Sequence, residues 1–356
     1  MGIRGGIGLV ISLLILSGCS AFSPSQESNV SPGPAESNDA EQENTPLSPY
    51  KPELSQKFSE PWPTEITRVE LANSAIYNAF KYLDTLGDSD CKIKAIVFAG
   101  EPVLDEHKPL LEEVSNKTIS TFCAFMDRDI FVIGGSYDFV EETIAKEKIQ
   151  RDFFKGCQRP AQESSSACAY DDIAWTGVSL GGKKRGEVFL EERRVTIAAH
   201  EIFHLVHDQM DPDPGGQIPG PDQPNFRPVW LNEGAGEMLG RLLPYYFGLI
   251  SAYGTFIPTD RYGGFLEKDY LGDLSAMEIR QRRADGIENY YSGQLAMEYI
   301  IASVGMESLM NIWLEMGKGN NFENAFEKAT GLKKKEFYKL FKQMHGNLFE
   351  GNLATN

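Results

Sequence analysis

The sequence predicts an α+β fold, in which a part with a mixed sheet at residues 63–192 precedes a mostly helical part at residues 193–350. Two observations lead to this prediction. In the first part, short apolar runs typical of strands alternate with helical stretches. In the second part, apolar residues recur at helical spacing, and loops rich in Pro and Gly separate the segments. The folded length is sufficient for a sizeable core or for two lobes around a cleft.

The spacing of apolar side chains gives the elements of the first part. Helices are expected at 64–86, 110–114 and 136–154, and strands at 92–99, at 188–190 and once or twice within 121–134. In the second part, the same reasoning predicts helices at 195–210, 288–301, 306–316, 322–329 and 334–344. The segment 211–228 is rich in Pro and Gly and is expected to form a loop.

The central motif of the chain is H-E-x-x-H at residues 200–204, within the helix expected at 195–210. Two histidines four residues apart lie on the same side of a helix, so both imidazoles of His200 and His204 can bind one metal ion. Glu201 lies beside them, where it can reach a water molecule on that metal. This arrangement is typical of a zinc hydrolase, with one Zn²⁺ per chain and Glu201 as general base.

A second motif, W-L-N-E-G at residues 230–234, follows downstream. Together the two motifs resemble those of the gluzincin metallopeptidases, above all the aminopeptidase N and thermolysin-like group. The resemblance implies that Glu233 is the third zinc ligand beside His200 and His204, and that the chain hydrolyses peptide bonds. The metzincin alternative fails because its third histidine would fall at Met210.

Three further expectations follow from this resemblance. Glu237 shares a helix face with Glu233 and is expected to orient a ligand histidine, although pairing with Arg241 explains it equally well. Tyr290 or Tyr291 is expected to donate a hydrogen bond to the oxyanion of the transition state. An edge strand at 177–180 or 186–190 would pair with the backbone of the substrate. The G-x-M-E-N motif of aminopeptidase N is absent, which favours an endopeptidase.

The N-terminus predicts export. Residues 1–18 combine Arg4 with the apolar run Ile7–Leu16, which is too short to cross a bilayer, and they resemble a lipoprotein signal that ends before Cys19. Lipid on Cys19, including palmitate, would attach the chain to the membrane of a bacterial cell envelope, and to the outer membrane in a two-membrane organism. An ordinary signal peptide is the alternative. Residues 19–62 are rich in Ser, Pro, Glu and Asn, and are expected to form a disordered tether.

The remaining cysteines and the charge restrict the chemistry further. An even number of cysteines in an exported domain predicts disulfides, and we favour Cys91–Cys123 and Cys157–Cys168 among three possible pairings. The formal net charge of −17 argues against nucleic acid as a partner.

Three alternatives remain from the sequence. The chain could be a surface binding lipoprotein on an inactive peptidase scaffold, or a zinc hydrolase that acts on a cell-wall cross-link. Asp211, Asp213 and Asp222 in the loop between the motifs could hold calcium, but their spacing is not that of an EF-hand, and a plain surface loop is favoured.

Overall fold

The structure is a computed structural model that describes residue 58 and residues 60–86, 90–101, 107–157, 159, 167–177, 187–211, 226–253, 272–279 and 287–353. The predicted signal, Cys19 and nearly all of the tether therefore lie outside the described residues. Within those described, no helix is both long enough and apolar enough to span a membrane.

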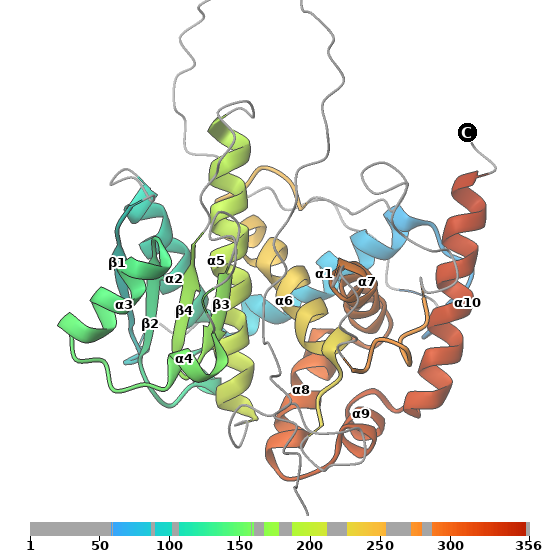
Figure 1. The fold of residues 1–356 in the computed structure, drawn as a ribbon. Coiled ribbons are helices and arrows are strands. Elements are labelled where there is room, and N and C mark those ends of the chain that lie inside the picture. The colour runs from blue at the N-terminus through green and yellow to red at the C-terminus, as the bar shows by residue number, and fades with distance from the viewer. Residues whose placement is uncertain are drawn as a thin grey trace, which may run out of the picture.

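The described part is an α+β fold that is mostly helical, with one four-stranded mixed sheet. Its strands are β1 (Ala95–Ala99), β2 (Ile130–Gly134), β3 (Ala167–Tyr170) and β4 (Ile173–Thr176). They lie in the order β1-β2-β4-β3; the first three of these run parallel, and β3 pairs antiparallel with β4 at the edge. Figure 1 shows the sheet on one side of α5 (Glu187–Met210) and the later helices on the other.

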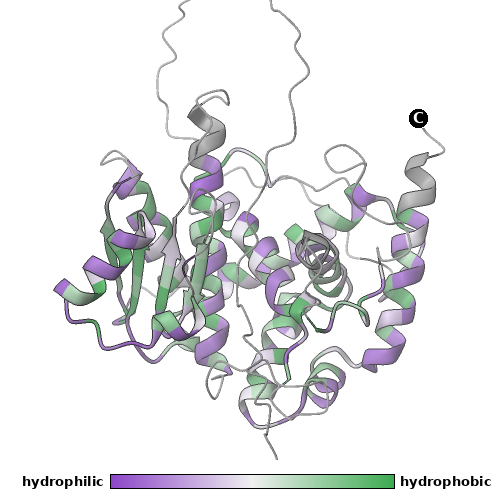
Figure 2. Cartoon of the chain, viewed as in Figure 1, coloured by the Kyte–Doolittle hydropathy of each residue, from purple (hydrophilic) through white to green (hydrophobic). Residues whose placement is uncertain are grey.

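Helices cover both faces of the sheet. Successive side chains of a strand point to opposite faces, so Ile130 and Val132 join the main core while Ile133 joins a smaller cluster on the other face. The main core lies under α5 and α2 (Lys108–Phe122). The smaller cluster lies under α3 (Tyr137–Lys146) and the short α4 (Phe153–Gly156). In Figure 2 the strands are mostly green, as expected for a sheet buried on both faces.

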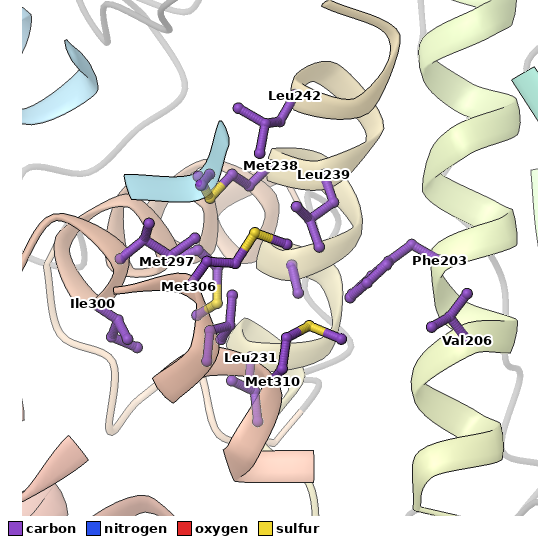
Figure 3. Packing of buried hydrophobic residues seen from close by; sticks show 14 of the residues in the cluster. Phe203, Val206, Leu231, Met238, Leu239, Leu242, Met297, Ile300, Met306 and Met310 are labelled. Atoms are coloured by element: carbon purple, nitrogen blue, oxygen red, sulfur yellow. The ribbon is translucent and has the colours of Figure 1, made fainter. Parts of the chain in front are cut away.

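The helical part surrounds the far side of α5. Its helices are α1 (Arg68–Leu86), α6 (Val229–Tyr246), α7 (Ile287–Val304), α8 (Met306–Gly317), α9 (Phe322–Thr330) and α10 (Lys334–Leu353). Helix α6 packs against both α5 and α7. Figure 3 shows the packing between them, where Phe203 of α5 points toward Leu239 of α6 and Met310 of α8. These buried contacts fix the distance between the two helices that carry the motifs.

Several sequence-based expectations need correction. The strand expected at 188–190 is wrong, because α5 already begins at Glu187. The segment 191–194 consists of Glu and Arg, which are strong helix formers, so nothing interrupts the helix before the H-E-x-x-H motif. The boundary drawn between residues 192 and 193 consequently falls inside α5. The edge strand expected at 186–190 is wrong for the same reason, and residues 178–180 of the other expected edge strand lie outside the described residues.

Other boundaries shift in the first part. The helix expected at 136–154 is divided into α3 and α4, because Lys148 has a φ of 53° in the left-handed region and ends the helical path. Helix α2 is much longer than 110–114 and ends at Phe122, which leaves β2 as the one strand within 121–134; a short 3-10 helix (Cys123–Phe125) separates the two. Strands β3 and β4 were not predicted.

Both favoured disulfides are present. Cys91 is bonded to Cys123, which ties the segment before β1 to the end of α2. Cys157 is bonded to Cys168, which ties the end of α4 to the edge strand β3. Each disulfide joins neighbouring elements around the sheet, so both restrict the unfolded chain within the same part of the molecule.

Candidate metal centre

The two histidines of the H-E-x-x-H motif face the same point. His200 and His204 lie one turn apart on α5, and their Nε2 atoms are 2.9 Å apart. The rings meet edge to face, with centroids 4.7 Å apart. Both histidines are mostly shielded from solvent, with 10% and 14% of their side chains exposed. Because each ring directs its Nε2 toward the other, one cation between them would contact both nitrogens.

The third donor comes from α6. Glu233 Oε2 lies 3.7 Å from the Nε2 atom of His200 and 3.7 Å from that of His204. A triangle with these sides has a point about 2 Å from each corner, which is the length of a zinc–nitrogen or zinc–oxygen bond. The three donors thus form a buried group that could hold a metal ion, and the donor set of two imidazoles and one carboxylate suits zinc.

Glycines on α6 permit this close approach. A Cβ atom on Gly236 would lie 2.8 Å from ring atoms of His200, and one on Gly240 would lie 2.7 Å from the backbone oxygen of Thr196. On the other side of α6, a Cβ on Gly234 would lie 2.3 Å from the backbone of Gly293 in α7. Any larger residue would push the helices apart, and Glu233 would move away from the histidines.

Glu237 pairs with Arg241, as one interpretation of the sequence expects, and it also lies near His200, the histidine that the other interpretation expects it to orient. It accepts hydrogen bonds from Arg241 at 2.9 and 2.5 Å, and its Oε2 lies 3.8 Å from Nδ1 of His200. Burial alone would raise the pKa of Glu237, but the charges of Arg241 and His200 lower it below its ordinary value. The carboxylate therefore stays ionised beside the ring nitrogen of His200 that faces away from the other donors.

Glu201 is buried beside the donors, with 4% of the residue exposed. Burial raises the pKa of its carboxyl to about 8; the charge of His204 opposes this rise, and that of Glu233 adds to it. A cation at the three donors would shift the balance toward the carboxylate. The structure thus places a buried carboxyl group next to the point at which the three donors converge.

The two tyrosines differ in their surroundings. The ring of Tyr290, in the first turns of α7, lies 5.9 Å from the ring of His200. Tyr291 interacts electrostatically with Arg241 and contributes to raising the pKa of that guanidinium above its ordinary value. Tyr290 thus lies against a histidine of the candidate metal site.

Sequence reasoning missed three residues next to the site: His207, Asp208 and Arg227. Nε2 of His207 lies 2.9 Å from Nδ1 of His204. The signal was present in the sequence, because residues three apart on a helix are neighbours. The contacts of Arg227 carried no such signal, since they depend on how α6 folds back onto α5.

The loop between the motifs is described only at its ends. Asp211 accepts a hydrogen bond from Nε of Arg227 at 2.8 Å. Asp213 and Asp222, the other two candidates for calcium, lie outside the described residues. The two ends of the loop are therefore held together by an ion pair.

Comparison of this chain with models of known protein families, with curated proteins and with solved structures finds no significant match. The case for a function consequently depends on the arrangement of the side chains themselves.

Proposed function

We propose that this chain is a zinc-dependent peptidase that hydrolyses peptide bonds. The observation that carries the proposal is the convergence of His200, His204 and Glu233 on one point, with the buried carboxylate of Glu201 beside it. Three protein ligands leave a tetrahedral metal with a free position, as catalytic zinc sites require. When bound, zinc supplies a positive charge that makes a water molecule a stronger nucleophile at neutral pH.

The surrounding side chains have separate roles in this proposal. Glu201 accepts a proton from the attacking water and then gives it to the nitrogen that leaves as the amine. Glu237 orients His200 through its Nδ1 atom, and Arg241 keeps the carboxylate in place. Tyr290, rather than Tyr291, is our candidate for the hydrogen bond to the oxyanion, because its ring lies beside His200.

We assign the chain to the gluzincin type on two grounds. The third donor is a glutamate on the helix that follows the H-E-x-x-H helix, and a mixed sheet lies against the other side of that helix. The absence of G-x-M-E-N favours an endopeptidase. We also propose that lipid on Cys19 anchors the enzyme in the cell envelope; a Cys19→Ser chain that still sediments with membranes would overturn this.

The test of catalysis uses the full chain, purified in detergent, and a mixture of internally quenched peptides of random sequence. Glu201→Gln should keep its zinc, measured by metal analysis, and lose hydrolysis by about 10²–10⁴-fold. Glu192→Gln is the matched control, because Glu192 lies on the same helix and contacts Ser251 instead of the site. Its turnover should remain that of the wild type.

The metal is tested by Glu233→Ala. The wild type should hold one zinc per chain, and this variant should retain much less. A wild type that binds no zinc after reconstitution would overturn the proposed function and favour a surface binding lipoprotein. Hydrolysis that survives Glu201→Gln would overturn the role of Glu201 alone.

A further inference from the structure

His207 is enclosed on all sides. Its ring stacks on Trp313 of α8 with an interplanar angle of 9° and a centroid separation of 5.4 Å, and the ring of Phe203 meets it at 5.8 Å. Only 2% of the residue is exposed. Both ring nitrogens face polar groups: Nε2 lies 2.9 Å from Nδ1 of His204, and Nδ1 lies 3.2 Å from Oδ1 of Asp208. The ring therefore links a carboxylate to a metal-binding histidine.

Arg227 contacts the same Oδ1 atom of Asp208 that faces His207. The guanidinium donates one hydrogen bond to Asp208 at 2.7 Å and another to Asp211 at 2.8 Å. Arg227 lies immediately before α6, which carries Glu233, and only 9% of its side chain is exposed. The contacts thus run from the beginning of α6, through the end of α5, to the Nδ1 atom of His204.

The positions of the hydrogens follow from the donors and acceptors. An ionised carboxylate only accepts, so a hydrogen on Nδ1 of His207 is favoured next to Asp208. A neutral imidazole then has a free lone pair on Nε2, which accepts the hydrogen on Nδ1 of His204. With its hydrogen on Nδ1, His204 presents a lone pair on Nε2, the atom that faces His200 and Glu233. Metal binding requires this tautomer.

We propose that His207 is a positioning residue for the metal centre: by accepting a hydrogen bond from His204, it fixes the tautomer and ring orientation of that ligand. The inference rests on the zinc site of the proposed function and adds to it. A histidine that served packing alone would need only its shape between Phe203 and Trp313. A positioning histidine also needs an acceptor at Nε2, and the two roles can be separated.

The first experiment measures zinc affinity of the full chain at neutral pH by competition with a chromophoric chelator. His207→Phe keeps an aromatic ring beside Trp313 but removes the acceptor, so zinc affinity should fall about 10–100-fold. His207→Gln keeps a side-chain oxygen that can accept, and should recover most of the affinity. His345→Phe is the matched control, because it replaces another buried histidine, on α10, outside the site. This variant chain should bind zinc as tightly as the wild type does.

Two outcomes of this titration would overturn the proposal. One is a His207→Phe chain that binds zinc as tightly as the wild type. The other is an equal loss in the Phe and Gln variants while His345→Phe is unaffected, which would show a packing role.

The second experiment does not depend on zinc or on a variant that folds. Proton–nitrogen correlation spectra of the imidazoles in the metal-free wild type report which ring nitrogen of His204 carries hydrogen. We expect Nδ1. Hydrogen on Nε2 would overturn the positioning role even if the wild type binds zinc. If the wild type binds none, the proposed function fails, while this spectrum still decides whether His207 sets the tautomer.

Discussion

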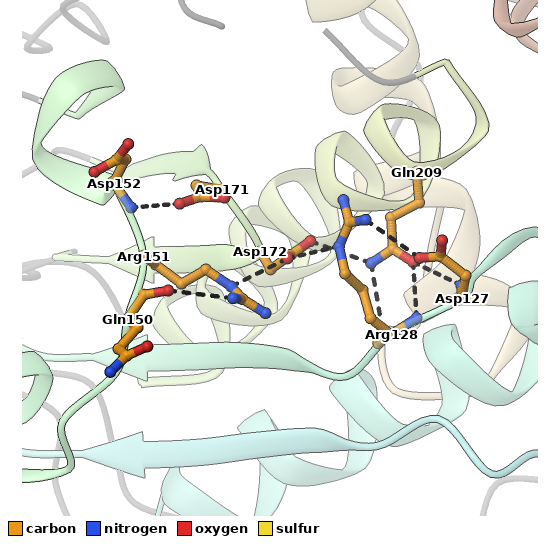
Figure 4. A network of polar contacts seen from close by, with 8 residues as sticks. All are labelled: Asp127, Arg128, Gln150, Arg151, Asp152, Asp171, Asp172 and Gln209. Atoms are coloured by element: carbon orange, nitrogen blue, oxygen red, sulfur yellow. Dashed lines mark hydrogen bonds and ion pairs between the residues drawn. The ribbon is translucent and has the colours of Figure 1, made fainter. Parts of the chain in front are cut away.

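Two polar networks contact α5 at the neighbouring residues Asp208 and Gln209, and they differ in how deeply their arginines are buried. Gln209 belongs to a network at the sheet, in which Asp172 binds Arg128 at 2.7 Å and Arg151 at 3.2 Å (Figure 4). Asp208 belongs to the network of Arg227 at the metal centre. In the first, the two arginine side chains are 44% and 32% exposed; in the second, Arg227 is 9% exposed.

The difference teaches that the same pairing of aspartate with arginine can serve two purposes. At the sheet, Arg128 and Gln209 join the turn between β3 and β4 to the end of α5, and water can replace much of what either side chain contributes. At the candidate metal centre, water has little access, and the network ends on the ring nitrogen of His204. The buried network is therefore expected to affect both stability and metal binding, and the exposed one only stability.

The largest effect should come from removing the buried arginine. Arg227→Met leaves Asp208 and Asp211 without their shared cation, and the free energy of unfolding should fall by about 3–5 kcal/mol. Arg128→Met is the matched change at the sheet; it leaves Arg151 on Asp172, and should cost about 1 kcal/mol or less. Urea unfolding of the metal-free chain measures both. Equal losses would show that depth does not separate the two networks.

A buried histidine away from both networks provides the next comparison. Burial lowers the pKa of His345 from 6.5 to about 4, so its neutral form stabilises the fold fully above pH 6.5, and this contribution is lost as the pH falls toward 4. The loss amounts to about 3 kcal/mol. His345→Gln should remove this part of the acid sensitivity. The measurement is the free energy of unfolding of the metal-free chain at pH 7 and pH 4, and an unchanged difference would contradict the prediction.

A smaller effect should distinguish the two aspartates that share Arg227. Oδ1 of Asp208 lies 3.2 Å from Nδ1 of His207, although not in the straight geometry of a full hydrogen bond, whereas Asp211 pairs with Arg227. Asp208→Ala should therefore weaken zinc binding by about tenfold, at the low end of what such orienting contacts contribute. Asp211→Ala should change zinc affinity much less. Competition with a chromophoric chelator measures the zinc affinity of both variants. A larger loss in Asp211→Ala than in Asp208→Ala would refute the proposal that Asp208 acts on His204 through His207.

The smallest effect is expected at the residue next to Asp208. Gln209→Ala removes contacts to the backbone N–H of Asp127 at 2.9 Å and to Asp172 at 3.3 Å, both at the sheet. The free energy of unfolding should fall by about 1 kcal/mol, the usual contribution of a hydrogen bond. Zinc affinity should stay at its wild-type value. A loss of zinc binding here would mean that the two networks are coupled through α5.

Two helices of the second part were the most predictable elements. The segments 306–316 and 322–329 match α8 and α9 almost to the residue, because several turns of apolar spacing add up to a strong signal. Strands β3 and β4 each have four residues, too few for a period to emerge, and both pack against α5. The residues at 188–190 are apolar enough for a strand, but the helix formers that follow extend α5 through them.

The site was predictable where it depended on spacing along one helix. The convergence of His200 with His204 follows from the helical repeat alone. The distance from Glu233 to both of them does not, since it requires Gly236 and Gly240 to let α6 approach α5. The contact of Tyr290 with His200 likewise depends on how α7 packs, and spacing along one helix does not give it.

By itself, the sequence determined the chemistry that is available: two histidines and a glutamate on one helix, a carboxylate on the next, and cysteines close enough in the chain to pair. These are local properties, set by the geometry of the helix and by short separations along the chain. Only the tertiary structure decided that Arg227 reaches Asp208 and that Trp313 stacks on His207. Such contacts join residues far apart in the chain, and they arise only when packing of the core brings their helices together.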